Sequence, residues 1–170
     1  SLPEAISRER KHLEPIAANA DLLIDTTDLT PRALRDMITS RLVQRRDGLS
    51  VLFESFAFKR GVPTDADFVF DARALPNPYW RDDLRSQTGL DAEVIQFLEN
   101  NPRCLAFFDK LRDFIAGVLH DFDQSDRSYM TIAIGCTGGQ HRSVYLTEKL
   151  HRDLIAQFPA AQIRHRDLHE

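Results

Sequence analysis

The stretch YMTIAIGCTGGQHRS, residues 129–143, decides the fold class of this chain. Its first six residues are nearly continuous in apolar character, which is typical of a strand buried on both faces of a parallel sheet. A glycine-rich turn follows from residue 135, and apolar residues at helical spacing continue from Ser143 to Phe158. Strand, turn and helix in this order indicate one βα unit of an α/β protein.

The rest of the chain supplies further strands and helices on either side of this unit. Apolar runs bounded by turn residues predict strands at residues 51–58, 68–73 and 162–166. Helical spacing predicts two more helices, at residues 91–100 and 103–120. The second is expected to bury Leu105, Phe108, Leu111, Ile115 and Leu119. We therefore predict an α/β fold with a mostly parallel sheet flanked by helices.

Residues 1–47 are predicted to be the end of a larger α/β domain, and residues 48–170 a second domain. A strand followed by a helix is only half of a βαβ unit, and this is what the first part contains. Its expected elements are a polar helix at residues 1–20, a strand at residues 21–26, and a helix that Thr30 and Pro31 begin and Gly48 ends.

Composition bounds the class of protein. The chain has 170 residues, of which 42% are hydrophobic and 28% charged, as in an ordinary globular protein. Its net charge of −4 disfavours wholesale nucleic-acid binding but leaves room for a local basic patch. Neither a membrane span nor a signal peptide is recognisable. Cys104 and Cys136 fit no metal-ligand or disulfide spacing, so we expect a cytoplasmic protein without a membrane or metal partner.

The glycine-rich turn carries the strongest functional signal. It places free backbone N–H groups and the positive end of a helix dipole at one point, as anion sites do. Its glycines let the backbone approach a ligand closely. Arg142 can grip a phosphate in bidentate fashion, and Thr137 and Ser143 can donate hydroxyl hydrogen bonds. The sequence predicts an anion site, and the alternative is a tight turn whose glycines serve packing alone.

The same turn matches the Cys-x5-Arg-Ser spacing of cysteine-dependent phosphatases, through Cys136, Arg142 and Ser143. A cysteine at a helix N-terminus beside an arginine has a lowered pKa and can attack phosphorus. Those enzymes have histidine before the cysteine, where Gly135 stands here. The candidates for a general acid are Asp65, Asp67 and Asp71. We expect Cys136 to line the pocket, and the phosphatase is the alternative.

The loop after the 68–73 strand is the second candidate region. Ligands of open parallel sheets lie beyond the carboxyl ends of the strands, where Arg73 and Asn77 are expected. They would join the anion site if their strand is adjacent to the 129–134 strand, and otherwise Arg73 is a solvated arginine. Tyr79 and Trp80 are expected to pack rather than to stack on bases.

Three weaker signals have ordinary alternatives. Lys59 and Arg60 are either a charged turn or part of a nucleic-acid patch with Arg85, Arg164 and Arg166. Asp65 and Asp67 are expected to be turn residues rather than metal ligands. His165 and His169 are expected to lie in a strand and a tail rather than to bind metal.

Several strings together resemble the RNase adapter (RapZ, or YvcJ-type) family, and the resemblance spans essentially the whole chain. These strings are VLFESFAFKRG (51–61), DAD (65–67), FDAR (70–73), LPNP (75–78), TG (88–89), GCTGG (135–139) and HRSV (141–144).

The resemblance implies a phosphofructokinase-like character for residues 48–170. It also implies an N-terminal Walker-type domain that binds ATP or GTP. The P-loop of that domain is not in this sequence, so we expect no nucleotide cofactor and no enzyme activity in this chain. The resemblance further implies a homodimer or homotetramer that binds small regulatory RNA, guides it to ribonuclease E and senses glucosamine-6-phosphate, so that amino-sugar synthesis is controlled.

The family's phosphosugar site maps onto the glycine-rich turn and the nearby loop. Its residues are Cys136, Thr137, Gly138, Gly139, His141, Arg142 and Ser143, with Arg73 and Asn77. Its RNA contacts map onto Lys59, Arg60, Arg85 and Arg142, which Arg164 and Arg166 would extend. Tyr79 and Gln140 replace an expected histidine and lysine, and the chain ends without a lysine cluster. A protein-interaction module without RNA binding is therefore a further alternative.

Overall fold

A computed structural model describes residues 2–38, 48–125 and 127–168 of the chain. Four strands form one sheet in the order β2-β3-β1-β4, and every pairing is parallel. Their bounds are Ser50–Ala57 for β1, Phe68–Asp71 for β2, Tyr129–Cys136 for β3 and Gln162–His165 for β4. The predicted α/β fold with a parallel sheet is confirmed.

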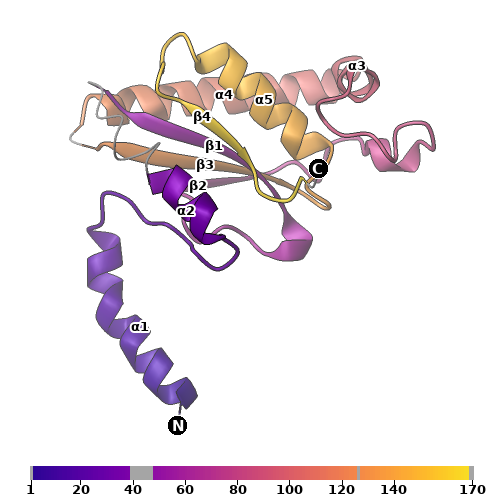
Figure 1. The fold of residues 1–170 in the computed structure, drawn as a ribbon. Coiled ribbons are helices and arrows are strands. Elements are labelled where there is room, and N and C mark those ends of the chain that lie inside the picture. Colours follow the sequence, from indigo (N-terminus) through magenta and orange to yellow (C-terminus); the bar gives the residue numbers. More distant parts are fainter. Residues whose placement is uncertain (1, 39–47, 126, 169–170) are drawn as a thin grey trace.

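Helices α4 (Pro102–Asp123) and α5 (Arg142–Leu154) cover one face of the sheet (Figure 1). Helix α3 (Ala92–Glu99) packs against α4. The core lies between the sheet and the two longer helices, where Phe53 and Ile132 of the central strands meet Phe108 and Leu150. On the opposite side of the same strands, Leu52, Glu54 and Phe56 are also buried.

Helix α4 differs by one residue from its predicted inward stripe. Leu105 is 38% exposed, and the buried position in that turn is Cys104. The buried residues then follow at steps of four and three, so that the stripe continues through Phe108 and Leu111. Because successive residues of a helix differ by about 100° in direction, Leu105 points to the flank of the helix. Asn101 caps the first turn by accepting a hydrogen bond from the Arg103 N–H at 3.0 Å.

The first 38 residues contain helices α1 (Leu2–Ala18) and α2 (Pro31–Ile38). Helix α1 buries no residue and stands clear of the sheet in Figure 1. The predicted strand at residues 21–26 is wrong, because this segment is irregular. The carboxylate of Asp25 accepts hydrogen bonds from the backbone N–H and the hydroxyl of Thr27, a local turn that competes with strand geometry.

The helix predicted from Thr30 begins as expected, since the Thr30 hydroxyl accepts a hydrogen bond from the Ala33 N–H at 3.1 Å. Its expected course from residue 39 to residue 47 lies outside the described residues. Within the described part of the chain, no helix combines the length and the apolar character that crossing a membrane requires.

Candidate functional site

The glycine-rich turn lies at the carboxyl edge of the sheet, between the end of β3 at Cys136 and the start of α5 at Arg142. Gly139 adopts a φ of +71°, which L side chains rarely adopt. A Cβ on it would come within 3.0 Å of the Cβ atoms of Ala57 and Asp167. The turn is therefore pressed against the end of β1, and only glycine fits at this position.

Polar groups surround the sulfur of Cys136. Its Sγ lies 3.1 Å from the Ser143 hydroxyl, and the backbone N–H groups of Ser143 and Gly139 also point to it. Burial raises the pKa of the Cys136 thiol, but these hydrogen bonds and the charge of Arg142 outweigh burial and lower it overall. The other cysteine, Cys104, has a pKa that burial raises.

Arg142 ties the turn to the loop after β2. Its Nη1 donates to the backbone carbonyls of Arg73 at 2.9 Å and Leu75 at 3.0 Å. Its Nη2 lies 3.4 Å from the hydroxyl of Thr137. The side chain is buried, and its Nε has no hydrogen-bond partner. Nη1 is thus engaged within the protein and Nε is buried without an acceptor, whereas the weakly bonded Nη2 retains donor capacity for a ligand.

His141 faces the segment that precedes α3 rather than solvent. Its Nε2 lies 3.2 Å from the Leu84 carbonyl oxygen. Burial lowers the pKa of His141, and the carbonyls of Leu84 and Gln87 oppose that effect only in part. Gly89 packs tightly beside it, since a Cβ there would lie 2.3 Å from the His141 carbonyl oxygen. His141 is therefore a neutral side chain near pH 7 that holds the N-terminus of α5 against residues 84–89.

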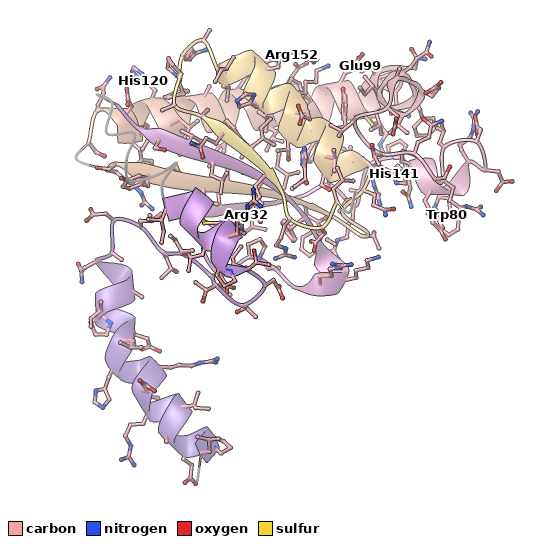
Figure 2. All side chains as sticks on the ribbon, in the orientation of Figure 1. Arg32, Trp80, Glu99, His120, His141 and Arg152 are labelled. Atoms are coloured by element: carbon pink, nitrogen blue, oxygen red, sulfur yellow. The ribbon has the colours of Figure 1, made fainter. Side chains whose placement is uncertain are left out.

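A cavity of about 390 Å³ opens over the turn. That volume falls within the range of roughly 300–1,000 Å³ that is usual for small-molecule sites. Its lining residues are Lys59, Asn77, Tyr79, Trp80, Cys136, Thr137, Gly138, Gln140, His141 and Arg142. Figure 2 shows His141 and Trp80 at the same end of the sheet.

Most of the predicted phosphosugar residues surround this cavity, because β2 pairs directly with β3. Gly139 is buried in the turn and Ser143 is buried in the first turn of α5. Arg73 contributes its carbonyl, while its guanidinium pairs with Asp71 at 2.7 Å and lies over the Phe58 ring at 3.8 Å. Its side chain is not among those that line the cavity.

Aromatic side chains form part of the cavity wall, which the sequence did not indicate. Trp80 is 77% exposed and Tyr79 is 47% exposed, so neither is a core residue, and the expected packing is limited to the contact between the two rings. They belong to a short 3-10 helix, η3 (Pro78–Trp80), capped by the side chain of Asn77. The only sequence signal for this part of the wall was the Pro76-Asn77-Pro78 string, whose prolines restrict the backbone just before Tyr79 and Trp80.

Lys59 joins the cavity from the other side. It belongs to a second 3-10 helix, η2 (Phe58–Arg60), directly after β1. Its backbone N–H donates to the Thr137 carbonyl at 3.4 Å, and its Nζ lies 4.0 Å from where a Cβ on Gly138 would be. The cavity therefore holds two cations, Lys59 and Arg142, and no carboxylate among the residues described as lining it.

The other predicted RNA-binding arginines differ in how strongly contacts within the protein hold their side chains. Arg85 pairs with Asp82 at 2.7 Å and lies over the Tyr79 ring beside the cavity. Arg60 is 3.6 Å from Asp167 and remains half exposed. Two are committed to internal contacts: Arg164 pairs with the buried Glu54, and Arg166 with Asp167 and the Gly61 carbonyl.

The weaker metal candidates have other partners. Asp67 pairs with Arg127 and accepts a hydrogen bond from the Thr131 N–H. His165 contacts the Ser55 hydroxyl and the Glu148 carboxylate, and His169 lies outside the described residues. Across residues 2–38, 48–125 and 127–168, no three potential ligands of the histidine, cysteine, aspartate and glutamate types are grouped around one point.

Comparison with known proteins agrees with this architecture. The RapZ C-terminal domain family matches residues 49–169, and the RapZ-like N-terminal domain family matches residues 1–46. A nucleotide-binding protein of Cellvibrio japonicus is 48% identical over 171 residues, which cover 100% of this chain and 58% of that protein. Proteins of the same name from Marinobacter nauticus and Pseudomonas putida are each 52% identical over 169 residues, covering 99% of this chain and 58% and 60% of the relatives. The chain thus spans about three fifths of the length of these relatives, and it belongs to the RapZ family.

Proposed function

We propose that the cavity binds a phosphorylated amino sugar, glucosamine-6-phosphate, and that its occupancy regulates an RNA adapter. The observation that carries this proposal is the cavity itself. It places the N-terminus of α5, the Lys59 ammonium and the Arg142 guanidinium around one space, with no carboxylate among the residues described as lining it. Such a site favours a compact dianion over a neutral sugar.

The phosphate group would lie on the turn. Backbone N–H groups of the turn that do not point to Cys136, together with the dipole of α5, would provide donors and positive potential there. Lys59 would neutralise one phosphate oxygen, and the weakly bonded Nη2 of Arg142 would serve another. Each charge-assisted contact of this kind contributes about 1.5–3 kcal/mol.

The sugar would extend toward the aromatic wall. Asn77, Gln140 and Thr137 offer amide and hydroxyl groups that can bond to sugar hydroxyls or to the amino group. Trp80 presents an apolar ring face, which suits the C–H face of a pyranose. Gln140 is neutral where the family resemblance leads us to expect lysine, so the two cations of this cavity would hold the phosphate without a third.

RNA binding would share part of this site. Lys59 lines the cavity and also belongs to the predicted RNA patch, which Arg60 and Arg85 extend at the mouth. A bound sugar phosphate would neutralise Lys59 and lower the affinity for RNA, because each phosphate contact contributes to RNA binding. Such competition would make the sugar phosphate a regulatory signal through its different affinity for the two states.

The proposal also covers the longer, intact protein. The relatives are named nucleotide-binding proteins and are longer than this chain. We infer that the intact protein binds ATP or GTP in its N-terminal domain, assembles as a homodimer or homotetramer, and guides small RNA to ribonuclease E. In this proposal, residues 48–170 supply the metabolite and RNA surface.

The phosphatase alternative is supported by the lowered pKa of Cys136 and by the contact between Cys136 and Ser143. A phosphatase also needs a proton donor for the leaving group. Asp71 is engaged by Arg73, and among the described residues no carboxylate lines the cavity. One edge of Arg142 is also held by backbone carbonyls. The geometry favours binding over turnover.

Calorimetric titration tests the proposal directly. Glucosamine-6-phosphate is titrated into the chain, with glucosamine and inorganic phosphate as separate controls. We expect micromolar binding of the sugar phosphate that exceeds both controls, and loss of that binding in Lys59→Ala but not in Lys110→Ala, an exposed lysine on α4. Equal binding of inorganic phosphate would reduce the cavity to a general anion site. Release of phosphate from an aryl phosphate that depends on Cys136 would favour the phosphatase instead.

A further inference from the structure

The two cysteines of the chain lie in opposite environments. Cys104 is buried in the first turn of α4 and packs in the core. Cys136 also lies below the surface, at 2% exposure, but it lines the cavity at the N-terminus of the 13-residue helix α5. Its sulfur lies 3.1 Å from the Ser143 hydroxyl, which can donate a hydrogen bond to it, and a helix N-terminus beside an arginine stabilises negative charge on sulfur.

A second observation points to the same space. Arg142 is 4% exposed and also lines the cavity, and its Nε has no hydrogen-bond partner. A buried guanidinium N–H without an acceptor favours an anion beside it. An oxygen atom gained by the Cys136 sulfur would place a hydrogen-bond acceptor in the cavity that Arg142 also lines.

We propose that Cys136 is a modification site, a cavity-lining nucleophilic thiolate that small electrophiles, hydrogen peroxide in particular, oxidise or alkylate. The thiolate sulfur attacks one oxygen of peroxide, and the O–O bond breaks. The sulfur gains that oxygen and is oxidised by two electrons to a sulfenic acid, while the departing hydroxide takes a proton and becomes water. With an alkyl halide the same sulfur forms a C–S bond, and halide departs.

The cavity imposes a size limit on the reagents. Cys136 is nearly closed to bulk solvent, so a reagent must approach through the cavity of about 390 Å³. Peroxide and iodoacetamide fit that space, whereas a polymer-linked maleimide does not. We therefore expect selectivity for small reagents that an ordinary surface thiol would not show.

Modification and ligand binding should exclude each other. A sulfenic oxygen on Cys136 would project from the turn into the space where the proposed phosphate lies. Protection by glucosamine-6-phosphate therefore rests on the proposed function, whereas the reactivity of the thiol does not. The two can fail separately, since a reactive thiol that the sugar phosphate does not protect counts against the proposed ligand alone.

The test compares three forms of the chain: Cys104→Ser, Cys136→Ser and Ser143→Ala. Iodoacetamide and peroxide are each added to folded protein, with dimedone to trap sulfenic acid, and adducts are counted by intact mass. We expect Cys104→Ser to react at least about tenfold faster than Cys136→Ser near pH 7, as a stabilised thiolate should. Equal rates, or adducts only after unfolding in urea, would overturn the proposal.

Ser143→Ala keeps the test decisive if Cys136→Ser folds poorly. Removal of the hydroxyl takes one donor from the sulfur, so the pH midpoint of alkylation should move upward while the rate at high pH is retained. An unchanged midpoint would show that the turn does not stabilise the thiolate and would contradict the proposal.

Discussion

The guanidinium of Arg142, in the first turn of α5, donates a hydrogen bond to the backbone carbonyl of Arg73 at 2.9 Å. This contact joins the end of β2 to the turn after β3, across 69 positions of sequence. One side chain thus fixes the two loops that frame the cavity. Arg142 therefore supports the structure and, through its remaining donors, contributes to the proposed site.

Substitution of Arg142 by alanine should lower both stability and affinity. The carbonyls of Arg73 and Leu75 would lose their donor, which costs about 1–3 kcal/mol when the groups remain buried. Affinity for glucosamine-6-phosphate should fall by about 1.5–3 kcal/mol, the strength of a charge-assisted contact. Urea unfolding and calorimetry measure the two separately. Loss of stability with unchanged affinity would remove Arg142 from the ligand site.

Lys59→Ala should weaken sugar-phosphate binding and RNA binding together, because one ammonium is proposed to serve both. For RNA, the slope of log affinity against log salt should become shallower by roughly 0.7, the contribution of one phosphate contact to a single strand. Lys110→Ala, on the exposed surface of α4, is the matched control. A variant that loses sugar-phosphate affinity but keeps its RNA salt slope would separate the two surfaces.

Gly139→Ala should destabilise the fold, since φ is +71° and the new Cβ would meet Ala57 and Asp167. The left-handed conformation alone costs about 1–2 kcal/mol for a residue with a Cβ. Gly117→Ala is the control, because its site in α4 is open and a helical alanine should gain about 0.5–1 kcal/mol. Urea unfolding should therefore give opposite signs for the two variants, and equal signs would contradict the assignment of strain to Gly139.

The sequence predicted correctly those strands and helices whose own residues show a clear apolar run or helical spacing. Strand β3 lies where the sequence predicted it, and α5 begins within one residue of its predicted start but ends at Leu154 rather than at Phe158. The strand at residues 21–26 was wrong because Asp25 bonds to Thr27 within its own turn, a competition that hydrophobicity does not register. Leu105 was predicted to be buried, but the neighbouring Cys104 takes the buried position. Leu105 lies beside the apolar stripe of the helix, and its apolar character alone does not distinguish it from a member of that stripe.

The cavity was only partly predictable. Its turn was visible as glycines between a strand and a helix, but Lys59 and Trp80 enter from η2 and η3. Their approach depends on the sheet order β2-β3-β1-β4, which places the ends of β2 and β1 on either side of β3. Strand order is a long-range property that the spacing of residues in one segment does not contain.

Trp80 gives the cavity a built-in reporter, because it is the single tryptophan of the chain. If the sugar ring lies against it, glucosamine-6-phosphate should change its fluorescence, and inorganic phosphate should change it less. Trp80→Ala should weaken the sugar phosphate by about 0.5–1.5 kcal/mol, the contribution of a ring contact, and leave phosphate affinity unchanged. Equal losses for both ligands would place the sugar elsewhere in the cavity.

Glu54 should make stability fall as pH rises. Its side chain is fully buried, and burial raises its pKa above the ordinary value of 4.5 although Arg164 opposes this. A carboxyl with a raised pKa keeps its proton to a higher pH in the folded state than in the unfolded chain, so its contribution to stability is present below pH 4.5 and is lost as pH rises toward the folded pKa. Glu54→Gln keeps an oxygen for Arg164 without the charge. Its stability relative to the unsubstituted chain should therefore increase from pH 4.5 to neutral pH in urea unfolding. Arg164→Met, which leaves Glu54 and Asp65 without their shared cation, should instead cost about 3–5 kcal/mol at neutral pH. A difference between Glu54→Gln and the unsubstituted chain that stays constant with pH would show that Glu54 is ionised throughout.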